Sequence, residues 1–137
     1  MAQHQVLSIL IVEDDHAMRS LLCDELWELG YRIVEAADGD EALDRIVEDH
    51  PALILTDLRM PVGGLDYVSR LRTLAPTCPI ILMTAFGDAD TRTEARQCGV
   101  AAYFDKPVRI SELKAAIRHC LRSDDAASFS PPEKDDA

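Results

Sequence analysis

Residues 7–15 read LSILIVEDD, a short apolar run that ends directly in three acidic side chains. The same pattern recurs as ALILTD at residues 52–57, and another apolar run, PIILM, occupies residues 79–83. Continuous Val, Ile and Leu runs of this length are typical of strands that are covered on both faces of a sheet. These stretches therefore predict the central strands of a buried parallel sheet.

Amphipathic stretches separate the apolar runs along the chain. The pattern predicts strands at residues 7–12, 31–36, 52–56, 79–83 and 101–104, and helices at residues 16–29, 40–49, 65–74, 88–98 and 110–121. The second strand alternates more between apolar and polar residues, so we expect it nearer an edge of the sheet. Five strands alternating with five helices predict an α/β fold, a doubly wound three-layer sandwich around a parallel sheet.

The composition fits one globular domain followed by an acidic tail. Of the 137 residues, 47% are hydrophobic but only 5% are aromatic, so the core is expected to be aliphatic. We place the domain at residues 5–122. Residues 123–137 hold five acids, one lysine and two prolines without periodicity, which predicts a disordered tail.

The net charge of −11 argues against two classes of partner. Sequence-independent binding to nucleic acid needs cationic contacts to phosphates, and an anionic membrane surface also repels an acidic chain. No apolar run approaches the ~20 residues that cross a bilayer, and the start of the chain lacks a secretory signal. The four cysteines form no CxxC pair and are interpreted as reduced thiols. We expect a cytoplasmic protein without direct contact to nucleic acid or membrane.

Chemically reactive side chains follow four of the predicted strands. The first strand ends in Glu13 and Asp14, the third in Asp57 and the fourth in Thr84, and Lys106 follows the fifth. In a doubly wound sheet, ligands bind beyond the carboxyl ends of the strands, which share one edge. The sequence therefore predicts a pocket that combines carboxylates, a hydroxyl and a lysine.

This combination suits the transfer of a phosphoryl group. Three ionised carboxylates repel one another, and a divalent cation with hard oxygen ligands, Mg²⁺ above all, relieves the repulsion. Asp57, at the tip of its strand, can act as a carboxylate nucleophile toward phosphorus. The metal and Lys106 would offset charge on the phosphoryl oxygens, and the Thr84 hydroxyl can donate to one of them.

Four motifs together resemble bacterial two-component response-regulator receiver domains: LIVEDD at 10–15, LTDLRMP at 55–61, ILMTA at 81–85 and YFDKP at 103–107. The resemblance covers about residues 5–122. It implies a flavodoxin-like (βα)5 fold with a five-stranded parallel sheet in the order 2-1-3-4-5. It also implies that the chain is a phosphoacceptor signalling switch and not an enzyme. Its catalysis would be limited to slow phosphorylation and dephosphorylation of itself.

The resemblance assigns a role to each matching residue. Asp57 would be the phosphoacceptor, and Lys106, whose bond to Pro107 is often cis in such domains, would bind the phosphoryl group. Thr84 would be the switch hydroxyl, and Tyr103 the aromatic side chain that follows it inward. The residues that would hold Mg²⁺, or Mn²⁺, are Glu13, Asp14, Asp57 and Arg59 through its backbone carbonyl.

The implied phosphodonor is a sensor histidine kinase, a histidine phosphotransfer protein or a small phosphodonor. Phosphorylation is expected to change the face formed by the fourth helix, the fifth strand and the fifth helix. An unknown downstream protein would read that face, or a phosphorylation-dependent homodimer would form through it. Arg59 and Phe86 occupy positions that tune dephosphorylation in similar proteins, and the loop Val62-Gly63-Gly64 is one residue shorter than usual and lacks an acid.

Other interpretations fit parts of the pattern. A haloacid-dehalogenase-type phosphatase uses similar groups, but its nucleophile follows the first strand in a DxD pattern, not the third. A phosphorylation-independent interaction domain would be favoured by a degenerate site, whereas all five groups are present here. Asp15 is expected to cap the following helix rather than assist the metal. Tyr103, without its motif, would be interpreted as half-buried packing.

Overall fold

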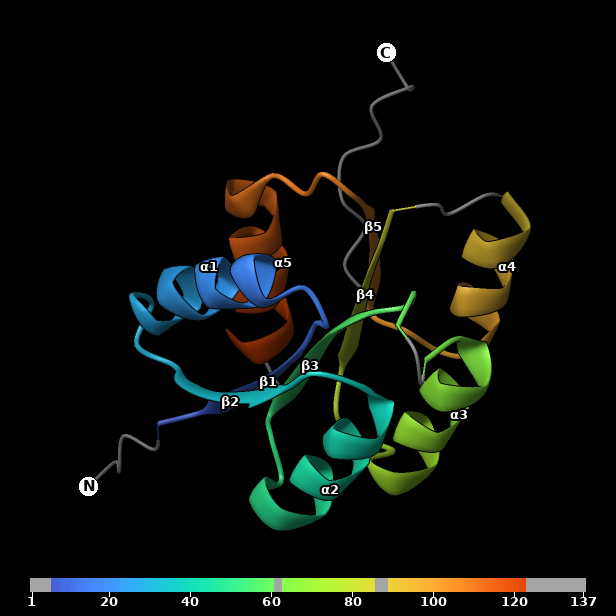
Figure 1. The fold of residues 1–137 in the computed structure, drawn as a ribbon, viewed down its shortest axis with the longest axis horizontal. Coiled ribbons are helices and arrows are strands. Elements are labelled where there is room, and N and C mark those ends of the chain that lie inside the picture. Colours follow the sequence, from blue (N-terminus) through green and yellow to red (C-terminus); the bar gives the residue numbers. More distant parts are fainter. Residues whose placement is uncertain (1–5, 61–62, 86–88, 123–137) are drawn as a thin grey trace.

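The computed structural model describes residues 6–60, 63–85 and 89–122, in which five strands alternate with five helices (Figure 1). The strands are β1 (Ser8–Val12), β2 (Arg32–Ala36), β3 (Leu53–Asp57), β4 (Ile80–Thr84) and β5 (Ala102–Asp105). The helices are α1 (His16–Trp27), α2 (Gly39–Asp49), α3 (Leu65–Leu74), α4 (Ala89–Gln97) and α5 (Ile110–Arg122). The predicted tail at residues 123–137, together with Val62 and Phe86, lies outside the described residues.

All neighbouring strands pair in parallel, in the order β2-β1-β3-β4-β5. This confirms the doubly wound, flavodoxin-like order that the resemblance implied. β2 lies at an edge and is mostly exposed or half-buried, as expected, whereas every residue of β1, β3 and β4 is buried. The order reverses between β1 and β3, which is where such sheets leave a crevice at their carboxyl ends.

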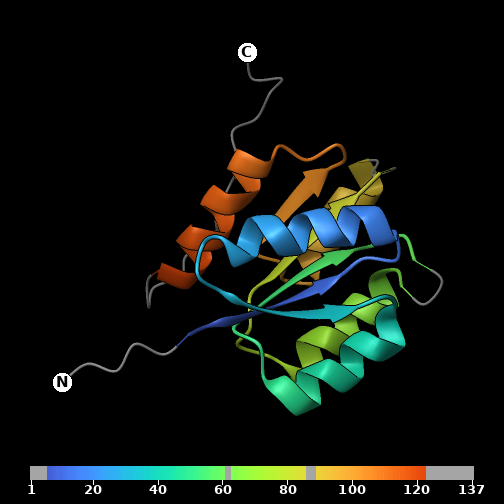
Figure 2. The same ribbon diagram turned by 60° about the vertical axis from the view of Figure 1, so that its left-hand side comes forward.

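Helices cover both faces of the sheet (Figure 2), and alternation along the strands divides the core into two layers. Ile9 and Ile11 of β1 belong to the layer under α1 and α5, whereas Leu10 and Val12 belong to the layer under α2, α3 and α4. The largest fully buried side chains are Ile and Leu, which confirms the expected aliphatic core. Burial on both faces makes the sheet a rigid platform for its carboxyl edge.

Local side-chain chemistry determines where the helices begin and end. Asp15 caps α1 as expected, since its carboxylate accepts a hydrogen bond from the Met18 amide at 3.1 Å. α1 ends at Trp27, two residues before the predicted end. The following amides of Leu29 and Gly30 bond three residues back rather than four, which tightens the last turn. Gly30 has a φ of 97°, a left-handed conformation that glycine adopts at low cost.

The four cysteines are free, as the sequence predicted: Cys78 and Cys120 are buried, and Cys23 and Cys98 are half-buried. Across the described parts of the chain, every helix is too short or too polar to span a membrane.

Candidate functional site

The predicted site residues lie together at the carboxyl edge of the sheet. Asp57 is the last residue of β3 and Thr84 the last of β4, so both lie at the strand ends where the sequence predicted them. The ladder reaches this far because the Leu58 amide donates to the Met83 carbonyl and the Lys106 amide donates to the Thr84 carbonyl. These hydrogen bonds fix the backbone of both reactive residues.

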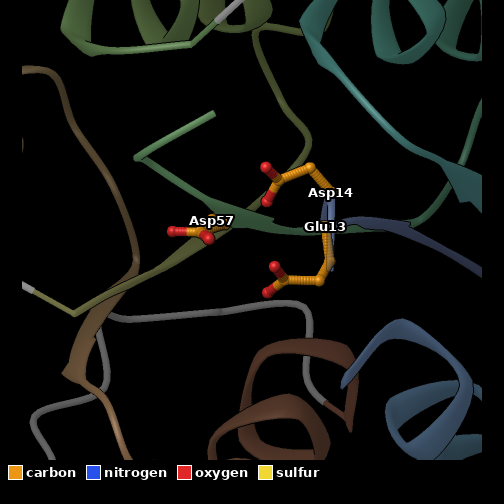
Figure 3. Close-up of side chains that lie close together, drawn as sticks. All are labelled: Glu13, Asp14 and Asp57. Atoms are coloured by element: carbon orange, nitrogen blue, oxygen red, sulfur yellow. The ribbon is translucent and has the colours of Figure 1, made fainter. Parts of the chain in front are cut away.

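Three carboxylates converge at this edge (Figure 3). Glu13, Asp14 and Asp57 each place one carboxylate oxygen within 4.8 Å of the others. Glu13 and Asp57 are almost completely buried, with 1% and 5% of their surface exposed, whereas Asp14 is exposed. Such a cluster costs electrostatic free energy unless cations compensate it.

Lys106 reaches into this cluster from the segment after β5. Its ammonium donates hydrogen bonds to Glu13 Oε1 at 2.7 Å and to Asp57 Oδ2 at 3.0 Å. The Lys106–Pro107 peptide bond is cis, in agreement with the resemblance. The sequence predicted that Lys106 binds the phosphoryl group, but it did not predict the hydrogen bond between Lys106 and Glu13.

The mutual proximity of these groups changes their proton affinities. Burial raises the pKa of the Glu13 carboxyl; the hydrogen bond from Lys106 opposes this rise and the charge of Asp57 adds to it. Burial lowers the pKa of the Lys106 ammonium, but its hydrogen bonds to Glu13 and Asp57 outweigh burial and leave the pKa above its ordinary value. Lys106 is therefore a stable cation at neutral pH.

The donor set fits a divalent metal ion. Lys106 forms ion pairs with two of the three carboxylates, those of Glu13 and Asp57. Three carboxylates and one ammonium leave two negative charges when ionised, which matches the charge of Mg²⁺. All three groups offer hard oxygen donors, and the exposure of Asp14 leaves room for water ligands.

Backbone amides orient two of the carboxylates. The Arg59 amide donates to Asp57 Oδ1 at 3.1 Å, and the Asp15 amide donates to Glu13 Oε2 at 3.2 Å. In both cases the donating amide belongs to the residue two positions after the acid. The turn that follows each strand therefore holds the carboxylate at the start of that turn in place. The Arg59 carbonyl stays a predicted metal ligand.

Thr84 lies at the end of β4, the strand next to β3, and Tyr103 lies on β5. Thr84 is fully buried, and Tyr103 is half-buried against the layer under α2, α3 and α4. Tyr103 therefore has the packing role that its strand position alone suggests. The switch roles of both residues stay predictions.

A hollow of about 650 Å³ opens beside Asp14, between the β3–α3 segment and α4. Its lining residues among the described ones are Asp14, Leu58, Arg59, Met60, Gly63, Gly64, Leu65 and Thr91. The cluster can thus be reached from solvent on the side of Asp14.

The sequence did not reveal that Arg19 supports the acidic segment. Arg19 Nη1 donates to the Glu13 carbonyl at 2.6 Å, and its Nε donates to the Glu35 carboxylate at 3.1 Å. The one sequence feature that could have indicated this role is the position of Arg19, one turn into the helix that follows the acid pair. A side chain at this position can point back toward the N-terminus of the helix.

The family model of the response regulator receiver domain matches residues 9–118. Sporulation initiation phosphotransferase F of Bacillus subtilis (strain 168) is 33% identical over 114 residues, which cover 82% of this chain and 92% of that protein. A probable transcriptional regulator, ycf27 of Porphyridium aerugineum, is 38% identical over 121 residues, which cover 88% of this chain and 50% of that protein. A CheY-like receiver domain structure from Methanospirillum hungatei JF-1 matches with a TM-score of 0.83 and 28% identity, covering 86% and 95% of the two chains.

The chain belongs to the response regulator receiver domain family. It spans nearly all of the phosphotransferase but about half the length of the matched transcriptional regulators. Receiver domains are phosphoacceptor switches of two-component signalling that interact with histidine kinases and effectors and bind Mg²⁺ through an acidic cluster. Membership in this family decides against the haloacid-dehalogenase-type phosphatase.

Proposed function

We propose that Asp57 accepts the phosphoryl group in this chain. The observation that carries the proposal is the position of its carboxylate: buried at the tip of β3, 3.0 Å from the Lys106 ammonium, and close to two further acids. A carboxylate in this setting is held in place by its neighbours and faces groups that can offset the charge of a phosphoryl group.

The transfer would be a displacement at phosphorus. One Asp57 carboxylate oxygen forms the new O–P bond while the P–N bond of a phosphohistidine, or the O–P bond of a small acyl phosphate, breaks. The bonding electrons leave with the donor. Lys106 offsets charge on the phosphoryl oxygens, and the buried Thr84 hydroxyl donates a hydrogen bond to one of them.

Glu13, Asp14, Asp57 and the Arg59 carbonyl are the residues that would hold Mg²⁺, or Mn²⁺, at this site. When bound, the ion supplies positive charge that stabilises the phosphoryl oxygens during transfer. Glu13 contributes in a second way, because it shares Lys106 with Asp57 and so positions the ammonium beside the acceptor.

The donor would be a sensor histidine kinase, a histidine phosphotransfer protein or a small phosphodonor in the cytoplasm. The output would be a changed α4-β5-α5 face, read by a downstream protein or by a second copy of the chain. The net charge of −11 supports a protein partner rather than nucleic acid or a membrane. Catalysis would be limited to slow self-phosphorylation and self-dephosphorylation at Asp57.

Intact-mass measurement after incubation with acetyl phosphate and Mg²⁺ tests this proposal. We expect the wild type to gain the mass of one phosphoryl group, and Asp57→Asn or an excess of EDTA to abolish the gain. Asp15→Asn is the matched control, since asparagine also caps helices and the same charge is removed two positions from Glu13. An undiminished gain in Asp57→Asn, or none in the wild type, would overturn the assignment.

A further inference from the structure

Arg92 links helix α4 to the strand that carries Tyr103. It lies in the first turn of α4, and its guanidinium carbon is 5.4 Å from the centre of the Tyr103 ring. Its Nη2 donates to Asp105 Oδ2 at 2.8 Å. A cation within about 6 Å of a ring centre is attracted to the ring face, so one side chain makes two favourable contacts with β5.

The pleat of β5 explains why both contacts are available to one residue. Successive side chains of a strand point to opposite faces, so Tyr103 and Asp105 share a face and Phe104 takes the other. Phe104 indeed belongs to the layer under α1 and α5, whereas Tyr103 packs in the layer under α4. β5 is an edge strand of the sheet, and its Tyr103 face is turned toward the layer that contains α4.

The same contacts connect Arg92 to the phosphoryl-binding edge. Asp105 stands opposite Thr84 in the strand register and is followed directly by Lys106. The Lys106 amide donates to the Thr84 carbonyl at 2.8 Å. The Tyr103 hydroxyl oxygen is buried, so the structure shows the ring packed inward beneath the guanidinium.

We propose that Arg92 is a positioning residue of the switch, which holds the Tyr103 ring in its buried position and ties α4 to the end of β5. This inference rests on the proposed function of Asp57 and Thr84 and on the switch role that the resemblance predicts for Tyr103. If the buried position of Tyr103 accompanies phosphorylation, contacts that favour it also favour binding of the phosphoryl group, because the two equilibria are linked. The planar fork of arginine is suited to contact a ring and a carboxylate together, which lysine does less well.

Fluorine NMR of protein containing 3-fluorotyrosine tests the contact without phosphorylation. The chain has three tyrosines, and Tyr103→Phe identifies the resonance of Tyr103. In Arg92→Ala we expect this resonance to move and to become more sensitive to replacement of H₂O by D₂O, and in Arg92→Lys to change less. Arg96→Ala removes the same charge from an exposed position one turn further along α4 and should leave the resonance in place.

Calorimetric titration with beryllofluoride, a phosphoryl mimic, in the presence of Mg²⁺ tests the link to the switch. Arg92→Ala should weaken binding about two- to tenfold, the range expected for the loss of one exposed cation–π contact and one surface ion pair, and Arg96→Ala should not. An unchanged Tyr103 resonance or an unchanged affinity in Arg92→Ala would overturn the inference. Absence of binding by the wild type would instead overturn the proposed function, and the NMR comparison alone would then decide whether Arg92 positions Tyr103.

Discussion

Asp14 differs from the other members of the acidic cluster because it is exposed and, among the described residues, its carboxylate has no ion pair. Its charge therefore adds repulsion without a compensating protein contact. Unit charges about 4 Å apart interact by roughly 1 kcal/mol in a water-like environment. An acid at this position lowers stability as long as no cation is bound, which supports a role in holding a cation.

This argument makes a prediction about Asp14→Asn. In EDTA, the free energy of unfolding should rise by about 0.5–1 kcal/mol, because one of three mutually repelling charges is removed. Affinity for Mg²⁺ should fall at least about tenfold, since a charged ligand is lost. Urea unfolding with and without Mg²⁺ measures both effects. Asp44→Asn, on the exposed face of α2, is the control, and equal behaviour of the two variants would contradict the metal role.

At the scale of elements, the turn from β1 into α1 carries both the acid pair and the cap of the helix. Asp15 accepts from the Met18 amide through its side chain, while its own amide donates to Glu13. The cap and the acidic segment therefore share one residue. Only the side chain of Asp15 is engaged in capping, and only its backbone supports Glu13.

Asp15→Ala separates these two roles. Loss of the cap should lower the free energy of unfolding by about 1 kcal/mol, whereas Asp15→Ser should lose only a few tenths, because serine also caps helices well. The backbone hydrogen bond to Glu13 survives in both variants, so Mg²⁺ affinity should stay within about twofold of the wild type. Chemical denaturation and metal titration provide the measurements. A loss of Mg²⁺ affinity as large as that of Asp14→Asn would show that Asp15 assists the metal instead.

At the scale of the whole molecule, the two core layers are complete within the described residues. The last core side chain is Cys120, and α5 ends at Arg122. We therefore propose that residues 5–122 form the folding unit. A chain shortened to residues 1–122 should keep the wild-type free energy of unfolding within about 0.5 kcal/mol, since no buried contact of the described core is lost. A drop of several kcal/mol in urea unfolding would refute this boundary.

The fold class and the set of reactive groups could be predicted from the amino-acid pattern alone. Apolar runs of five or six residues have one stable solution when amphipathic helices separate them, which is a parallel sheet covered on both faces. Once the strands are parallel, Glu13, Asp57 and Lys106 must meet at one edge. Local rules also predicted the cap at Asp15 and the left-handed conformation of Gly30.

The pairing of these groups could not be predicted, because it depends on how the layers pack. Lys106 is shared between Glu13 and Asp57, which lie 93 and 49 positions away in the sequence. Arg92 contacts Tyr103 and Asp105 because α4 packs beside the edge strand β5. Periodicity and motifs report which face or edge a residue occupies. The partner of a long charged side chain depends on distances across packed elements, and these exist only after the layers have assembled.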